Sequence, residues 1–353
     1  MRTFAILSLC LAACEQDYNA GRLTQTDEFD QAPSNEVDIL WVIDDSTSMQ
    51  EEQASVKAAG ADFIAQLETA DMDFHIGLVT TDGDSTNAKA SQLLGEPTVL
   101  NSTCRDDGNT ADCTYQSDFE ARIEQGTGGS DQEKGLEVAL DAVRPPLSET
   151  MNVGFMRPDA LLMVIILSDE NDCSDGGRLG PTATGEDCYT RYDELTPVGD
   201  IVAAMRDAKA ELGKGNVEIS GIIGPDAAEG CTTAVPGFRY DEAIKVTGGV
   251  EADICLGDYS PVMQSLGLAA TGISTTFQLT YAADQTSIEV TVKDSAGNET
   301  KVDEDATNGW TYLEDYAQIQ FNGTAVPARE SHITVTYFSA GPVPDPPSSS
   351  SAS

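Results

Sequence analysis

The sequence predicts an α/β fold with a doubly wound, mostly parallel sheet flanked by helices, followed by a small C-terminal all-β domain. Three observations predict it. Strand-like and helix-like segments alternate between residues 37 and 271. The run Leu161–Leu167 is apolar without alternation, which is typical of a central parallel strand covered on both faces. After residue 272, short apolar runs are separated by turn residues, which is typical of antiparallel strands.

Four apolar runs are expected to form the parallel sheet: Val37–Ile43, Phe74–Val79, Leu161–Leu167 and Val217–Ile223. Apolar residues recur at helical spacing in residues 49–67, 136–143 and 201–212. Strands that alternate with helices favour a sheet wrapped on both faces. Sheets of this kind bind ligands at the carboxyl ends of their strands.

The predicted domain boundaries lie where the spacing of apolar and polar residues changes. Residues 37–271 are predicted to form the larger domain and residues 272–340 the small β domain, with strands near residues 277–281, 288–292, 319–321 and 333–337. Residues 15–36 are polar and lack periodicity, which predicts a flexible tether. Residues 341–353 are rich in Pro and Ser and are expected to be disordered.

The first 14 residues have the pattern of an export signal. Arg2 precedes an apolar run that is too short to span a bilayer. The run ends Leu11-Ala12-Ala13-Cys14, which resembles a bacterial lipobox and implies that Cys14 carries the lipid. The expected location is the bacterial cell envelope, on the outer membrane and facing the periplasm or the cell surface. An ordinary signal peptide with Cys14 unmodified remains the alternative.

The charge of the chain excludes some partners. Its formal net charge is -41, from 60 acidic and 19 basic residues. Such a field repels phosphate, so we expect no nucleic-acid partner and no membrane contact beyond the lipid anchor.

Six cysteines follow the export signal, and an even number in an exported chain predicts disulfides. Nearest-neighbour pairing is expected, because each such pair falls within one loop region. A zinc site is disfavoured, since the chain has no C-x-x-C motif and only two histidines. The cysteines are Cys104, Cys113, Cys173, Cys188, Cys231 and Cys255.

A D-x-S-x-S motif directly follows the first expected strand. It places Asp44, Ser46 and Ser48 in a tight turn, where one carboxylate and two hydroxyls can point at a single position. Hard oxygen donors of this kind suit Mg²⁺. The motif alone is weak, because Asp and Ser also form turns and helix caps by themselves.

Two further loops strengthen the motif. Gly128-Gly129-Ser130 precedes an expected helix, and Asp169 follows the central strand. With Asp44-Asp45-Ser46-Thr47-Ser48, these loops resemble the metal-ion-dependent adhesion site of the von Willebrand factor A family. The resemblance covers about residues 36–270. It implies the same doubly wound fold.

The resemblance also implies a set of metal ligands. Asp44, Ser46 and Ser48 would bind the ion directly, Ser130 directly or through water, and Asp169 through water. Two residues depart from the family pattern, since Ser130 replaces a threonine and Glu170 replaces a glycine. Thr127 and Glu133 remain alternatives to Ser130.

The function implied is that of a surface-anchored, metal-dependent adhesion or protein-binding module, not an enzyme. A partner's Asp or Glu carboxylate would complete the coordination of Mg²⁺, with Mn²⁺ or Ca²⁺ as alternative ions. A structural envelope protein stiffened by its metal is the second hypothesis. A metal-dependent hydrolase is the third, and the lack of G-x-S-x-G and of a suitable histidine disfavours it.

Overall fold

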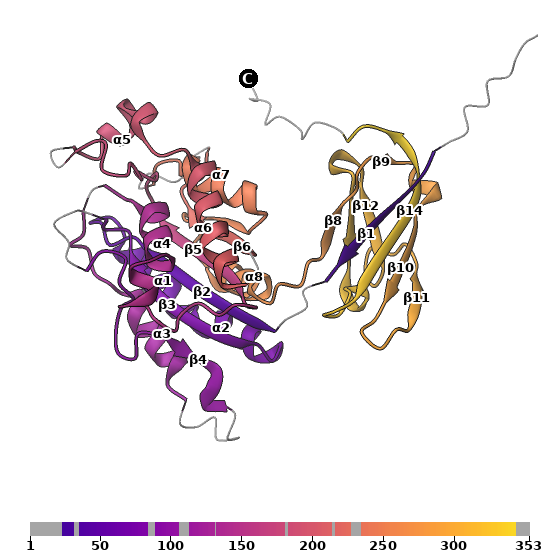
Figure 1. The fold of residues 1–353 in the computed structure, drawn as a ribbon, viewed down its shortest axis with the longest axis horizontal. Coiled ribbons are helices and arrows are strands. Elements are labelled where there is room, and N and C mark those ends of the chain that lie inside the picture. The colour runs from indigo at the N-terminus through magenta and orange to yellow at the C-terminus, as the bar shows by residue number, and fades with distance from the viewer. Residues whose placement is uncertain are drawn as a thin grey trace, which may run out of the picture.

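The computed structural model describes residues 23–31, 35–83, 89–105, 113–130, 132–180, 183–213, 216–226 and 234–343. Within these residues the strands form a six-stranded, a five-stranded and a three-stranded sheet (Figure 1). The expected signal peptide, Cys14 and the last ten residues lie outside the described residues.

The six-stranded sheet is mixed and has the order β4-β3-β2-β5-β6-β7. Its strands β2, β3, β5, β6 and β7 pair in parallel, whereas β4 pairs antiparallel to β3. The bounds are β2 (Glu36–Ile43), β3 (Asp73–Thr80), β4 (Leu100–Asn101), β5 (Leu161–Ser168), β6 (Val217–Ile223) and β7 (Glu251–Asp253).

Two apolar layers cover this sheet because side chains of β2 alternate between its faces. Trp41 packs in one layer and Val42 in the other. The first layer includes residues of α1 (Gln50–Ala58), α2 (Gly60–Thr69), α3 (Tyr115–Ile123) and α8 (Ser260–Ala270). The second includes residues of α4 (Gly135–Val143), α6 (Val198–Leu212) and α7 (Phe238–Thr247).

The helix expected over residues 49–67 is divided in two. Helix α1 ends at Ala58 and α2 begins at Gly60. A Cβ atom on Gly60 would lie 2.9 Å from the Glu120 side chain, so α2 packs against α3 at a distance that only glycine permits. The periodicity continued through the break because both helices turn an apolar face to the same layer.

A buried ion pair joins the first two strands of the chain in this sheet. Asp38, within β2, has no solvent exposure and accepts hydrogen bonds from Arg157 N (2.6 Å) and Nε (2.8 Å). Arg157 Nη1 also donates to Asp73 at 2.8 Å, at the start of β3. Burial raises the pKa of Asp38, and the charge of Arg157 opposes that rise.

The remaining strands form two antiparallel sheets around a separate apolar cluster that includes Val290, Ile319 and Tyr337. The five-stranded sheet contains β1 (Thr24–Asp30), β14 (His332–Gly341), β10 (Glu289–Lys293), β11 (Glu299–Val302) and β9 (Ala282–Ala283). The three-stranded sheet contains β12 (Trp310–Leu313), β13 (Gln318–Phe321) and β8 (Thr276–Gln278).

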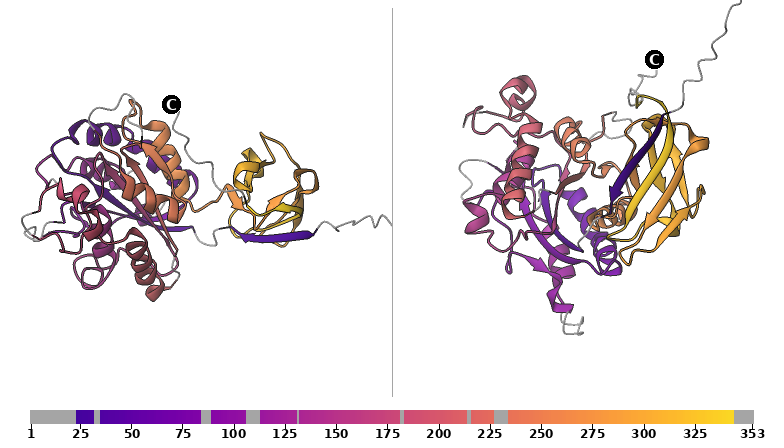
Figure 2. Two further views of the ribbon diagram at one scale, coloured as in Figure 1. Left: turned by 90° about the horizontal axis from the view of Figure 1, so that it is seen from above. Right: turned by 45° about the vertical axis from the view of Figure 1, so that its right-hand side comes forward.

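The predicted fold class was wrong. The chain is mixed α/β with two antiparallel β-sheets and a mixed six-stranded sheet, and not the doubly wound, mostly parallel sheet with a small C-terminal β domain that the sequence predicted. Part of the expected tether, residues 24–30, is strand β1, which pairs along its whole length with β14 (Figure 2). Apolar periodicity could not predict this pairing, because β1 is polar and half exposed.

Candidate functional site

The loop after β2 gathers the polar atoms of the D-x-S-x-S motif. Asp44 has no solvent exposure, and its Oδ1 accepts the amide of Ser46 at 2.8 Å. Its Oδ2 accepts the hydroxyl of Ser168, at the end of β5, at 2.6 Å. The hydroxyls of Ser46 and Ser48 lie 3.2 Å apart. The ends of two parallel neighbours, β2 and β5, therefore meet at the carboxylate of Asp44.

Gln53, in α1, holds a second loop against the first. Its Nε2 donates to the carbonyl oxygens of Asp44 (2.7 Å) and Gly126 (2.9 Å), and its Oε1 accepts the amide of Gly126 at 3.1 Å. Gly129 N donates to Asp45 O at 2.8 Å. A Cβ atom on Gly129 would lie 2.4 Å from Asp45 Oδ1, so this approach requires glycine.

Asp169 follows β5 and is 1% exposed. Among the described residues, neither of its carboxyl oxygens has a hydrogen-bond partner. Burial and the charge of Asp44 raise the pKa of Asp169 to about 6. The hydroxyl of Ser48 lies near enough to oppose that rise, although no hydrogen bond of good geometry joins the two groups.

Glu133 is one of the two residues that the sequence left as alternatives to Ser130. It is 1% exposed, and both of its carboxyl oxygens are buried without a hydrogen-bond partner in the described part of the chain. Burial and then the charge of Asp44 raise the pKa of Glu133 to about 10. Its backbone carbonyl accepts the amide of Cys173 at 2.6 Å, which joins the loop before α4 to the loop after β5.

Ser130 makes a different contact. Its hydroxyl accepts the amide of Gln132 at 3.1 Å, which closes a local turn. The carboxyl group of this loop whose pKa the charge of Asp44 raises belongs to Glu133. An acidic residue two places before the first residue of a helix was the only signal that could have favoured it in the sequence.

A third unsatisfied carboxyl group lies beside these. Asp45 Oδ1 is buried without a hydrogen bond within the described residues. Burial, the charge of Asp82 and the charge of Asp44 raise the pKa of Asp45 to about 6. Buried carboxyl groups normally have hydrogen-bond partners, so several orphaned oxygens at one edge of a sheet are unusual.

These donors can be tested against the expected divalent ion. The described residues contain no group of three or more His, Cys, Asp or Glu side chains placed to hold a metal by themselves. An ion here would therefore depend on the hydroxyls of Ser46 and Ser48 as well as on carboxylates. All the donors are hard oxygens, and the buried carboxyl oxygens of Asp169 and Glu133 have no hydrogen-bond partner within the described residues, so the residues fit Mg²⁺.

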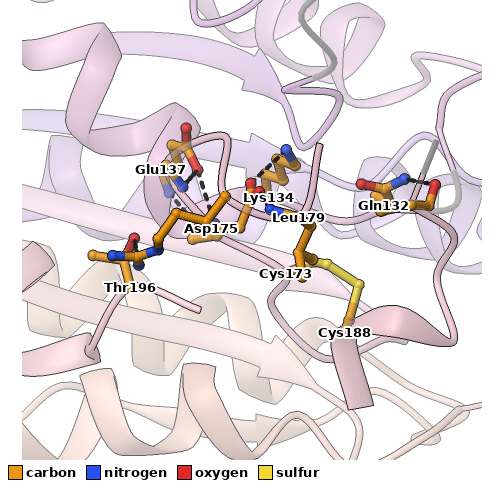
Figure 3. A network of polar contacts seen from close by, with 12 residues as sticks. Gln132, Lys134, Glu137, Cys173, Asp175, Leu179, Cys188 and Thr196 are labelled. Carbon is orange, nitrogen blue, oxygen red and sulfur yellow. Dashed lines mark hydrogen bonds and ion pairs between the residues drawn. A yellow bond between two sulfur atoms is a disulfide. The ribbon is translucent and has the colours of Figure 1, made fainter. Parts of the chain in front are cut away.

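The segment after Asp169 is held by buried polar contacts (Figure 3). Cys173 and Cys188 form a disulfide, and Lys134 Nζ lies 2.7 Å from Asp175. Glu137 accepts the amide of Asp175 at 3.1 Å. Because Lys134 and Glu137 flank the start of α4, these contacts attach the segment to the helix that begins at the site.

The disulfides follow the expected order along the chain. Cys104 pairs with Cys113 and Cys173 with Cys188. Cys255 is also disulfide-bonded, whereas Cys231 lies outside the described residues. Among the described helices, none is long and apolar enough to cross a membrane.

No known protein family matches the chain, and no curated protein does. Among solved structures, the chain is similar to the pilus adhesin SpaC from Lactobacillus rhamnosus GG, with 12% identity and a TM-score of 0.42 over 89% of this chain. The chain spans 40% of that adhesin's length.

Two other solved structures are similar over less of the chain. Proximal thread matrix protein 1 from the mussel byssus has 16% identity and a TM-score of 0.36, over 72% of this chain and 51% of its own. The PilB minor pilin from Streptococcus sanguinis, in a mutant form, has 12% identity and a TM-score of 0.36, over 68% of this chain and 62% of its own.

These findings correct the family prediction. No family model matches the chain, and the described residues hold no group of three or more His, Cys, Asp or Glu side chains placed to bind a metal. The chain is therefore not assigned to the von Willebrand factor A family.

Proposed function

We propose that this chain is a surface binding module, not an enzyme, and that it binds a protein partner through a divalent cation. The cation would be Mg²⁺, with Mn²⁺ or Ca²⁺ as alternatives. The observation that carries the proposal is the set of buried carboxyl oxygens without hydrogen bonds, in Asp169 and Glu133, beside the paired hydroxyls of Ser46 and Ser48. A bound cation would supply the missing positive charge and an open position for a partner's Asp or Glu carboxylate.

The protein's own residues prepare this site. Asp44 is oriented by Ser46 N and by the Ser168 hydroxyl, which leaves its carboxylate fixed at the end of β2. Gln53 keeps the loop of Gly126 against Asp44. From that loop we propose Glu133 as the ligand in place of Ser130, because the Ser130 hydroxyl already accepts the Gln132 amide.

We also propose that the chain is exported and anchored through a lipid on Cys14, at the outer membrane. The support is the lipobox-like sequence Leu11-Ala12-Ala13-Cys14, together with disulfides that persist in oxidising compartments. Mass spectrometry of the N-terminal peptide from isolated membranes tests this. An unmodified Cys14 would contradict it.

Titration of the protein with Mn²⁺, monitored by electron paramagnetic resonance, tests the cation site. We expect one ion bound per chain and competition by Mg²⁺. Asp169→Asn and Glu133→Gln should each weaken Mn²⁺ binding by roughly tenfold or more, since even outer contacts of a metal matter by that factor. Asp294→Asn is the matched control, because Asp294 is an exposed carboxylate in a turn before β11 that bonds Asn298.

Equal Mn²⁺ affinity in the wild type, Asp169→Asn and Glu133→Gln would refute the site. The function is tested by capture of a partner from the native cell envelope in Mg²⁺ and in EDTA. Partner capture that EDTA leaves unchanged would refute cation-dependent binding. Cation binding that only raises the melting temperature would instead support the structural alternative.

A further inference from the structure

We propose that three exposed aromatic residues next to the cation site, Tyr189, Tyr192 and Phe238, form a preformed platform that selects partners with an apolar side chain beside the coordinating carboxylate. This inference rests on the proposed function and deepens it, because it names the chemistry of the partner. The three residues are here called the aromatic platform. Their exposed fractions are 45%, 50% and 52%.

A disulfide and a backbone hydrogen bond attach the platform to the loop of Asp169. Tyr189 follows Cys188, whose disulfide to Cys173 ties it to the segment after Asp169, and the charges of Glu170 and Asp169 help to raise the pKa of its phenol after burial. Val235 N, in the chain leading to Phe238, donates to Asp169 O at 2.9 Å. Tyr189 and Phe238 therefore both belong to segments attached to the loop of Asp169.

Arg239 joins the other two aromatic residues to the same loop. It follows Phe238 directly, and its backbone amide donates to Asn171 Oδ1 at 2.9 Å. Its guanidinium pairs with the buried Asp172 at 3.0 Å and lies 5.7 Å from the ring centre of Tyr192. The buried Arg239 therefore connects both Tyr192 and Phe238 to the loop that follows Asp169.

The segment that carries Tyr189 and Tyr192 is held rigidly although its surface is exposed. Helix α5 (Asp187–Thr190) projects from the domain (Figure 1), and the Cys173–Cys188 bridge fastens it to the segment after Asp169 (Figure 3). Arg191 pairs with Glu194 at 2.7 Å. A recognition surface that is ordered before binding loses less conformational entropy on association.

The chemistry of the partner follows from the platform and the charge of the chain. Phe238 has no polar group, and tyrosines supply large apolar contact area at interfaces. A net charge of -41 disfavours a partner surface rich in acids. A single carboxylate with apolar neighbours satisfies both conditions, and a protein segment can supply it.

The test uses the full chain and two blocked synthetic pentapeptides. Each has one central glutamate, flanked by phenylalanine and leucine in one peptide and by two serines in the other. In millimolar Mg²⁺, measured by NMR titration, the apolar peptide should bind roughly tenfold more tightly. Tyr189→Ser with Phe238→Ser should remove that preference. Tyr281→Ser with Tyr316→Ser is the control, since these tyrosines are 40% and 46% exposed and lie in connections between strands of the antiparallel sheets.

The outcomes separate the two proposals. Binding of both peptides that Mg²⁺ strengthens, but with equal affinity, would overturn the platform and leave the proposed function standing. Binding that EDTA does not change would overturn the proposed function. Failure of both peptides to bind would overturn the platform. Retention on a neutral glucan gel that depends on Tyr189, without peptide preference, would replace the protein partner by a polysaccharide and also overturn it.

Discussion

Buried acidic side chains differ in how their charge is compensated. Asp38 is paired with Arg157 at 2.8 Å and Asp172 with Arg239 at 3.0 Å. Glu218, in β6, is half-buried, and within the described residues its carboxyl group has a long contact of 3.4 Å from the Ser220 hydroxyl and no ion pair. Burial raises the pKa of Glu218 to about 7 from an ordinary value of 4.5. An acid with a raised pKa destabilises the folded state once it ionises.

The contribution of Glu218 to the free energy of unfolding should therefore fall as the pH rises from 4.5 to about 7. In this window the folded state binds more protons than the unfolded state, so the unfolding free energy decreases with pH. The expected loss is about 3 kcal/mol at most. Glu218→Gln keeps the shape without the charge and should be more stable than the wild type at pH 8, but not at pH 4.

Urea unfolding at several pH values measures this difference between variant and wild type. Glu289→Gln is the control, because Glu289 is exposed and pairs with Lys301. If the free energies of unfolding of Glu218→Gln and the wild type differ by the same amount at every pH from 4 to 8, the pKa of Glu218 is not raised and the prediction is wrong.

The segment between β5 and α6 lacks long regular elements yet is well connected. Asp172, Ser174 and Asp175 are almost completely buried, with exposed fractions of 0%, 0% and 1%. Their hydrogen bonds go to Leu136 N, Glu137 N and Leu179 N, in α4 and within the segment. These polar contacts add to a small apolar cluster within the segment, formed by Cys173, Leu179, Cys188 and Leu195.

Loss of the Cys173–Cys188 bridge should loosen this segment. The bridge closes a loop with a sequence separation of 15, and its removal should cost about 2–4 kcal/mol. We expect Cys173→Ala with Cys188→Ala to speed amide hydrogen exchange in residues 174–180 and 183–197. The double variant Cys104→Ala with Cys113→Ala should leave exchange in these residues unchanged. Equal protection with and without the Cys173–Cys188 bridge would contradict the prediction.

At the scale of the whole molecule, the N-terminal segment belongs with the C-terminal sheets. Thr24 pairs with Phe338 and Asp30 with His332, so β1 covers the edge of β14. Phe29 packs against Phe277 with ring centres 5.2 Å apart. Strand β2 follows soon after β1, so the residues of the six-stranded sheet and its helices lie in sequence between β1 and the C-terminal strands.

A variant that begins at Glu36 should therefore lose structure in the antiparallel sheets and keep the six-stranded one. Removal of β1 exposes the β14 edge and the Phe277 ring. Limited proteolysis should cleave within residues 276–341 in this variant and leave residues 36–270 protected. A chain that ends at Val343 is the control and should resist cleavage like the wild type. Full protection of the antiparallel sheets without β1 would contradict the prediction.

Much of the candidate site was predictable because its signals are local. The strand Val37–Ile43 followed by D-x-S-x-S placed Asp44, Ser46 and Ser48, and the run Leu161–Leu167 placed Asp169 at a strand end. The third loop was not predictable. The local pattern does not tell that the Ser130 hydroxyl accepts the Gln132 amide, whereas the charge of Asp44 acts on the carboxyl group of Glu133.

The sequence by itself determined where the apolar strands and several helices lie, because each element reports its own burial through the spacing of its side chains. Only the tertiary structure decided which strands share a sheet. The hydrogen bonds of β1 go to β14, more than 300 residues away, as in the pair Thr26 and Thr336, with a separation of 310. Such pairing is set by backbone contacts between distant segments, and no local pattern in either segment encodes it.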